Sequence, residues 1–179
     1  MTIFGVDPGT ICTGYGIISF NGSRIADISS GIIRPSRTMN LGEKLACIYD
    51  ELSRLIKTYS PDQLSIETAF YGKNVQSAMK IGYVRGVALL ASVHNKVPAC
   101  EYSPREIKKS VVGNGAASKE QVQYMIKKLL NIHKTNIKFD ETDALAAAVC
   151  HAFNMNSIAK RESSWKEFVK ANPDRIISS

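Results

Sequence analysis

Four acidic residues occupy positions that solvation alone does not explain. Asp7 follows an apolar run, Glu67 ends the short apolar run QLSIE, and Asp140 and Asp143 open the alanine-rich stretch DETDALAAAV. A carboxylate at the end of a buried strand is costly unless a partner offsets its charge. Asp140 and Asp143 are three residues apart, so on a helix they share one face. These acids are therefore candidates for a common site.

A cluster of this kind suits metal chemistry. Carboxylates that meet in a dry pocket repel one another strongly, and either protons or divalent cations relieve the repulsion. Carboxylate oxygens select the hard ions Mg²⁺ and Mn²⁺, and two such ions about 3.5–4 Å apart are a standard arrangement for phosphodiester hydrolysis. Asp140 and Asp143 equally suit the start of a helix, and Glu67 could pair with a lysine. On the residues alone, a metal-dependent nuclease and structural uses of the acids both stay open.

The acids need a sheet whose strands end at one edge. The hydrophobic pattern predicts strands at 2–7, 13–20, 24–35, 63–67 and 97–102, and helices that begin near Leu41, at 74–94, from Pro104, at 119–131 and from Asp140. This order predicts an α/β chain with a mixed five-stranded sheet and helices on both faces. If the strands at 2–7 and 63–67 are neighbours, Asp7 and Glu67 meet at one edge, and the last helix must pack across it.

The length and the end of the chain predict its domain organisation. A chain of 179 residues suits one domain, which we place at residues 1–158. Residues 159–179 lose the apolar periodicity, so we predict a flexible basic tail there, with Trp165 and Phe168 as its only anchors.

Charge and composition narrow the class of partner and the compartment. The net charge of +7 favours a polyanion such as nucleic acid. The four cysteines are far apart and form no CxxC motif, which predicts buried free thiols. No run approaches about 20 apolar residues, and no secretory signal is visible. We therefore expect a cytoplasmic protein without a membrane partner.

Four blocks of the sequence resemble one known family. GVDPGTICTGYGII, IETAFYGKN, EYSPREIKKSVVGNGAASKEQV and DETDALAAAV follow in order over residues 2–155, and together they resemble the RuvC family of Holliday-junction resolvases (crossover junction endodeoxyribonucleases). The resemblance implies the ribonuclease H-like fold, a homodimer, and two Mg²⁺ ions per active site, with Mn²⁺ as a substitute. It also implies symmetric paired nicks in four-way junction DNA during recombination and repair, with a branch-migration helicase complex as a possible partner.

The resemblance also assigns roles to individual residues. It implies that the metal-binding catalytic acids are Asp7, Glu67, Asp140 and Asp143. It places Phe70 near the junction centre, where an exposed ring can stack on an unpaired base, and Lys73 and Asn74 in the same loop are expected DNA contacts. Lys108 and Lys119 correspond to two lysines near the scissile phosphate, where each would act as a point charge.

Two surface features extend this prediction. Helix 74–94 is apolar on more than one side, and Gly82 and Gly86 allow close approach of a second backbone. That backbone could be another helix of the same chain or a second copy of the protein, and the resemblance favours a two-fold dimer interface. Basic side chains are candidates for contacts with the DNA backbone. They are Arg34, Arg37, Lys73, Lys80, Arg85, Lys108, Lys109, Lys119, Lys127 and Lys128.

Other functions fit parts of the sequence. A strand followed by DPGT also resembles the opening of actin-like ATPases, but that fold needs two such domains and about twice this length. A non-catalytic junction binder would not need four intact acids. A ribonuclease H-like nuclease acting on another branched nucleic acid would use the same residues, and only a comparison of substrates separates it from a junction resolvase.

Overall fold

The computed structural model describes residues 1–68 and 75–171, those after 155 by their backbone alone. Its strands are β1 (Thr2–Asp7), β2 (Thr13–Phe20), β3 (Ile25–Ile33), β4 (Gln63–Glu67) and β5 (Ala99–Tyr102). Its helices are α1 (Leu41–Tyr59), α2 (Val75–His94), α3 (Pro104–Val112), α4 (Lys119–Leu129) and α5 (Phe139–Ala171). The predicted order of elements is confirmed.

The strands form one mixed sheet in the order β3-β2-β1-β4-β5. The first three strands pair antiparallel, whereas β4 runs parallel to both β1 and β5. The central strands β1 and β4 are therefore neighbours whose carboxyl ends meet at one edge of the sheet. This confirms the five-stranded α/β architecture expected from the sequence.

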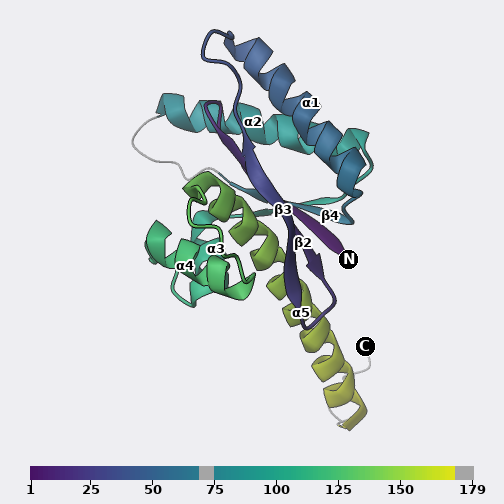
Figure 1. The fold of residues 1–179 in the computed structure, drawn as a ribbon. Coiled ribbons are helices and arrows are strands. Elements are labelled where there is room, and N and C mark those ends of the chain that lie inside the picture. Colours follow the sequence, from purple (N-terminus) through teal and green to yellow (C-terminus); the bar gives the residue numbers. More distant parts are fainter. Residues whose placement is uncertain (69–74, 172–179) are drawn as a thin grey trace.

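Helices cover both faces of the sheet (Figure 1). One hydrophobic core joins the sheet to α1 and α2 through Phe4, Val6, Leu52 and Val84, among others. The core on the opposite face is formed with α3, α4 and α5 and includes the alanine-rich run of α5. Alanine side chains are short, so α5 lies very close to β1.

The alternation of side chains along the strands decides what α5 meets. Phe4 and Val6 of β1 and Leu64 and Ile66 of β4 face α1 and α2, so the residues between them face α5. Accordingly, the Ser65 hydroxyl donates a 2.8 Å hydrogen bond to the carbonyl of Ala147 in α5. The same alternation directs Asp7 and Glu67, the last residues of these strands, toward the α5 side.

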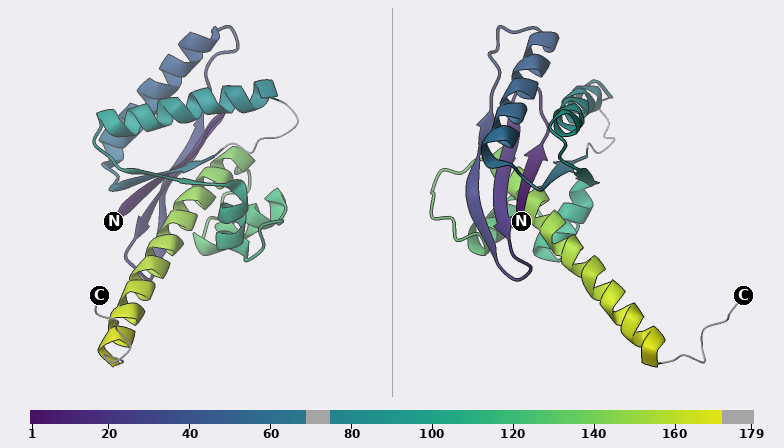
Figure 2. Two further views of the ribbon diagram at one scale, coloured as in Figure 1. Left: turned by 180° about the vertical axis from the view of Figure 1, so that it is seen from behind. Right: turned by 90° about the vertical axis from the view of Figure 1, so that its right-hand side faces the viewer.

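The last helix is longer than its hydrophobic pattern indicates. α5 continues to Ala171, and its C-terminal half projects beyond the sheet in both views of Figure 2. The backbone of residues 159–171 is therefore helical, and the flexibility expected for residues 159–179 stays a prediction. The segment contains neither glycine nor proline before Pro173, so the backbone can continue the helix although the apolar periodicity has ended.

Two further expectations can be compared with the structure. The four cysteines are free, as predicted, but only Cys150 is buried, while Cys12, Cys47 and Cys100 are partly exposed. Within the described ranges, no helix is sufficiently long and apolar to cross a membrane.

A buried histidine ties α5 to the parallel strands β4 and β5. His151 is 2% exposed, and its two ring nitrogens contact the Tyr102 hydroxyl at 2.7 Å and the side-chain oxygen of Gln63. The amide oxygen can only accept, so Nε2 carries the proton and Nδ1 accepts from the tyrosine. His151 thus holds the buried face of α5 against β4 and β5 through both ring nitrogens.

We predict that His151 makes folding stability depend on pH. Burial lowers the pKa of His151 below its ordinary value of 6.5, so on acidification the unfolded chain takes up this proton before the folded chain does. The contribution of His151 to the free energy of unfolding is therefore present above pH 6.5. It is lost as the pH falls toward the lower pKa that His151 has in the folded state. Urea unfolding at pH 7 and pH 5 isolates this contribution: the free energy of unfolding at pH 5, relative to that at pH 7, should be higher for His151→Gln than for wild type. His133→Gln, which changes a histidine outside the core, should behave like wild type; an unchanged pH dependence in His151→Gln would contradict the assignment.

Candidate active site

The first two predicted site residues come from neighbouring parallel strands. Val6 of β1 pairs with Ile66 of β4, and the next residue in each strand is Asp7 or Glu67. Both side chains are turned toward α5 and are only partly exposed. The parallel pairing thus places two carboxyl groups side by side at the carboxyl edge of the sheet.

The other two acids come from the start of α5, which crosses this edge. Asp140 and Asp143 lie in the first turns of the helix, where the Thr142 hydroxyl donates hydrogen bonds to the carbonyls of Lys138 and Phe139. The backbone of Asp140 lies directly on Gly14 of β2, where an added Cβ would stand 1.8 Å from the carbonyl oxygen of Asp140. The absence of a side chain at Gly14 therefore lets the helix start this close to the sheet.

Electrostatics show that the acids share one environment. Burial, followed by the charges of Glu67 and Asp143, raises the pKa of Asp7 to about 8. Burial and the charge of Asp143 likewise raise the pKa of Glu67 to about 7. Because desolvation and mutual repulsion disfavour full ionisation, the strand-end acids hold protons near neutral pH when no cation is bound.

Two predicted lysines adjoin this acidic edge. The Lys119 ammonium, at the start of α4, lies 2.7 Å from Oδ2 of Asp143. Burial alone would lower the pKa of Lys119, but the hydrogen bond to Asp143 and the surrounding acids raise it on balance. Lys108 of α3 is close enough for its charge to lower the pKa of Glu67 against these opposing effects. Both lysines are thus near the acids, and their contacts with a phosphate stay a prediction.

The four carboxyl groups are chemically suited to a hard divalent cation, but they are not arranged to bind one without a rearrangement. Four carboxyl groups are the ligands that Mg²⁺ prefers, and the raised pKa values of Asp7 and Glu67 reflect negative charge that a cation would neutralise. In the part of the chain that the structure describes, however, no three acidic, histidine or cysteine side chains are already arranged to hold a metal ion. Asp143 is instead paired with Lys119, so metal binding would require this ion pair to open.

Three predicted DNA contacts lie outside the described residues. Phe70, Lys73 and Asn74 belong to the segment between β4 and α2. Their roles stay predictions.

Sequence reasoning overlooked a buried acid between the two aspartates of α5. Glu141 is 3% exposed; its Oε1 accepts a 2.9 Å hydrogen bond from the Ser30 hydroxyl of β3 and lies 3.2 Å from Nζ of Lys134. These contacts fix the first turn of α5 to the outer strand of the sheet. In the sequence, the residues around Glu141 do not distinguish it from an acid exposed to solvent. The only indication of its burial is that it directly follows Asp140, so that on a helix the two side chains point to different sides.

The sheet order β3-β2-β1-β4-β5, with a helix start facing its acidic edge, defines an α/β protein of the ribonuclease H-like class. Among solved structures, "T. thermophilus RuvC in complex with Holliday junction substrate" matches with a TM-score of 0.82 at 26% identity, covering 88% of this chain and 96% of that one. The family model described as "Crossover junction endodeoxyribonuclease RuvC" matches residues 3–151. The chain belongs to the RuvC family.

Relatives from two bacteria match along nearly the whole chain. A crossover junction endodeoxyribonuclease RuvC of Chloroherpeton thalassium is 46% identical over 187 residues, which cover 99% of this chain and all of the relative. One of Cytophaga hutchinsonii is 44% identical over 174 residues, or 97% of this chain and 87% of the relative. The resemblance stated from the four sequence blocks is thereby confirmed.

Proposed function

We propose that this protein is a structure-selective endonuclease that resolves four-way DNA junctions by paired nicks, with Asp7, Glu67, Asp140 and Asp143 as its catalytic acids. One observation carries the assignment of the site: the strand-end acids and the first turn of α5 share one electrostatic environment at the carboxyl edge of the sheet. The names of the relatives, crossover junction endodeoxyribonucleases, supply the reaction and the substrate.

The four acids would hold Mg²⁺, or Mn²⁺ in its place, with two ions per site. When bound, such ions supply the Lewis acidity for hydrolysis of a phosphodiester. The protein's own part is to present its carboxylates on two rigid strands and one helix, so that their positions do not depend on loops. Asp7 and Glu67 must release the protons that their raised pKa values retain near neutral pH.

Lys119 has a separate part in this proposal. Its ammonium neutralises Asp143 in the absence of other ligands. With DNA bound, the same flexible cation can turn to a phosphate oxygen as a point charge. Lys108 lies near Glu67 and provides a second cation for the DNA backbone. The acidic edge is thus bordered by positive charge that suits a polyanionic substrate.

Incubation with synthetic DNA tests the proposed function. The protein is mixed with a four-way junction, a flap and a linear duplex of matched sequence, each with Mg²⁺, with Mn²⁺ and with EDTA. We expect paired, symmetric nicks in the junction alone, and only with a divalent ion. Preferential cutting of the flap would favour a nuclease for another branched substrate. Binding without cutting in every ion would contradict the enzymatic assignment.

We also propose that α2 forms the interface of a homodimer. One side of α2 packs into the core through Val84, Ala88 and Ala91. The opposite side exposes large apolar side chains at 42–69% of their surface, namely Val75, Met79, Tyr83, Leu90 and Val93. An added Cβ at Gly82 or Gly86 would meet no atom of the described chain within 4 Å, so a second α2 could approach closely there. A two-fold dimer would present two identical sites to the two opposed strands of a junction.

A charge on this face is predicted to dissociate the dimer. Leu90→Glu places a carboxylate where two copies of α2 would meet. Because this charge must be desolvated in the dimer, we expect the dissociation constant of the dimer to rise at least about tenfold. Sedimentation equilibrium measures the change. Tyr124→Glu is the matched control, since Tyr124 is 63% exposed on α4 and away from α2. A wild-type monomer at micromolar concentration, or equal behaviour of the two variants, would refute the α2 interface.

A further inference from the structure

Glu141 lies on the face of α5 that packs on the sheet. Two residues of this face, Ala144 and Leu145, lie directly on glycines of β1 and β2. Glu141 precedes them by three and four positions, so it belongs to the same face of the helix. An apolar side chain would satisfy the packing there, whereas a carboxylate that is 3% exposed is costly unless it is paired. An acid at this position therefore needs partners.

The first partner belongs to a row of residues that crosses the sheet beneath α5. From β3 to β4 this row consists of Ser30, Gly16, Gly5 and Ser65. The glycines let the helix backbone rest on the strands, and the serine at each end holds it. The Ser30 hydroxyl donates a 2.9 Å hydrogen bond to Glu141 in the first turns of α5, where the two aspartates lie. The Ser65 hydroxyl donates its 2.8 Å hydrogen bond to the carbonyl of Ala147, further along the helix.

The second partner comes from the segment that precedes α5. Nζ of Lys134 lies 3.2 Å from Oε1 and 3.5 Å from Oε2 of Glu141. Burial, followed by the charge of Glu141, raises the pKa of Asp27 in β3, and the charge of Lys134 opposes this rise. The three charges therefore lie together on this side of the helix. Through its two partners, the buried carboxylate joins the first turn of α5 to β3 and to the loop between α4 and α5.

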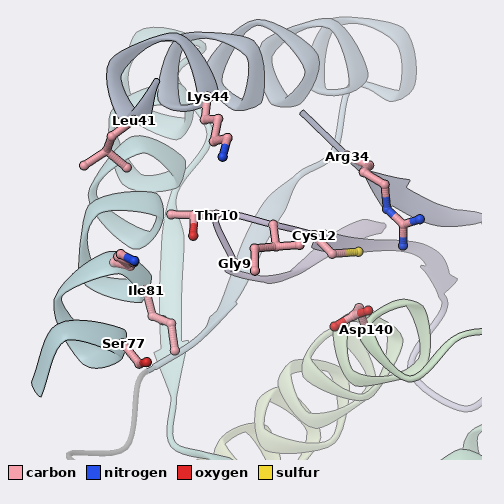
Figure 3. Close-up of a pocket in the computed structure, with 11 residues that line it drawn as sticks. Gly9, Thr10, Cys12, Arg34, Leu41, Lys44, Ser77, Ile81 and Asp140 are labelled. Atoms are coloured by element: carbon pink, nitrogen blue, oxygen red, sulfur yellow. The ribbon is translucent and has the colours of Figure 1, made fainter. Parts of the chain in front are cut away.

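Glu141 and the two aspartates point in different directions from the same part of the helix. An α-helix turns about 100° per residue, so the Glu141 side chain points about 100° from that of Asp140 and about 160° from that of Asp143. Accordingly, Glu141 faces β3, whereas Asp140 lines a cavity of about 790 Å³ beside the loop between β1 and β2. Figure 3 shows the Asp140 carboxylate at the start of α5, turned toward the part of that loop that carries Cys12. A rotation of the helix that carried Glu141 away from its partners would therefore redirect both aspartates.

We propose that Glu141 is a positioning residue for the reaction: its contacts with Ser30 and Lys134 fix the rotation of the first turn of α5 and so direct the two aspartates toward the strand-end acids. The proposal rests on the proposed function, because that function makes these four acids the catalytic set. Replacing a buried ion pair with an apolar side chain of similar volume often leaves stability unchanged or raises it. A residue whose role is positional should therefore lose activity on such a replacement while the fold stays stable.

Glu141→Leu separates positioning from stability. Leucine continues the apolar face of α5, so we expect the urea midpoint of the variant to equal or exceed that of wild type. With Mg²⁺ and saturating protein, the single-turnover nicking rate should fall about 10–100-fold. The dissociation constant for a four-way junction in EDTA should stay within about threefold of wild type, because the change removes no cation. Glu141→Gln retains an oxygen that accepts from Ser30 and should nick faster than Glu141→Leu.

Two serine variants provide a matched comparison that leaves the buried acid in place. Ser30→Ala removes the hydrogen bond at Glu141, and Ser65→Ala removes the one further along α5. Each variant takes one hydroxyl contact from the same helix. We expect Ser30→Ala to nick about fivefold to tenfold more slowly than wild type and Ser65→Ala to stay within about twofold of it. This pair decides the proposal even if Glu141→Leu is unstable.

Binding of Mn²⁺ without DNA gives a readout that needs no cleavage. Calorimetric titration should show a dissociation constant for Mn²⁺ about tenfold higher in Glu141→Leu than in wild type, and an unchanged one in Ser65→Ala. Wild-type nicking and Mn²⁺ affinity in a folded Glu141→Leu, or equal losses of rate in the two serine variants, would overturn the proposal. Failure of the wild type to nick any junction with Mg²⁺ would instead refute the proposed function, and the Mn²⁺ affinities would still decide whether Glu141 positions the acids.

Discussion

Asp7→Asn should abolish nicking, preserve junction binding and make the fold more stable. The carboxyl group of Asp7 ends a buried strand, and burial together with neighbouring acids raises its pKa to about 8. Asparagine keeps the shape but neither ionises nor serves as an anionic metal ligand. We expect the nicking rate with Mg²⁺ to fall by roughly 10²–10⁴, while the affinity for the junction in EDTA changes little because the basic side chains remain.

The stability effect has a definite sign and pH range. At neutral pH the folded state retains a proton on Asp7 that the unfolded chain, with a pKa near 3.8, has released. The contribution of Asp7 to wild-type stability therefore decreases as the pH rises from about 4 to about 8. The asparagine side chain lacks this dependence, so Asp7→Asn should raise the free energy of unfolding by about 1–2 kcal/mol at pH 7 and by little near pH 4. Urea denaturation at the two pH values measures the difference.

A control variant and the effect of Mg²⁺ on stability test whether these changes are specific to Asp7. Asp50→Asn changes an exposed carboxylate of α1 and should alter neither nicking nor the pH dependence of stability. Mg²⁺ should raise the thermal midpoint of wild type by mass action and should do so less in Asp7→Asn. Nicking at the wild-type rate in the variant would exclude Asp7 from the catalytic acids, whereas loss of nicking without any gain in stability would show that Asp7 is not electrostatically strained.

The acidic edge could be predicted from the sequence because it depends on local rules. An apolar strand that ends in a charge, the two-residue alternation of side chains and the parallel pairing of β1 with β4 together bring Asp7 beside Glu67. The three-residue spacing of Asp140 and Asp143 puts them on one helix face. Each of these rules acts over a few residues, or requires only that two strands be neighbours.

The rest of the site depends on contacts that have no local signature. Lys119 reaches Asp143 across the packing of α4 on α5, and Glu141 is buried because β3 and Lys134 meet it there. Lys44 lines the cavity beside Asp140 only because the start of α1 lies close to the β1–β2 loop. In the sequence these side chains look like ordinary solvated charges. The full length of α5 was equally inaccessible, because a helix that extends past its core loses the apolar period by which it is recognised.

Gly14→Ala should impair catalysis more than it impairs folding. The new Cβ would stand 1.8 Å from the carbonyl oxygen of Asp140, where real Cβ atoms essentially never come within 3.0 Å, so the start of α5 must move by more than 1 Å. This movement carries Asp140 and Asp143 away from the strand-end acids. A misplacement of about 1 Å can cost a hundredfold in rate, whereas the overpacking should cost about 1–3 kcal/mol of stability.

The prediction is tested by measuring nicking with Mg²⁺ under conditions where thermal and urea unfolding show the variant to be folded. Gly42→Ala is the matched control, because its added Cβ would meet its nearest neighbour, the Asn40 side chain, at an ordinary 3.4 Å. Gly5→Ala gives a second comparison: its Cβ would strike the carbonyl of Ala144 at 2.0 Å, one turn further along α5, and should reduce stability at least as much. If Gly14→Ala stays folded and nicks at the wild-type rate, the position of the α5 start does not control the reaction, and the assignment of Asp140 and Asp143 to the catalytic set loses its structural basis.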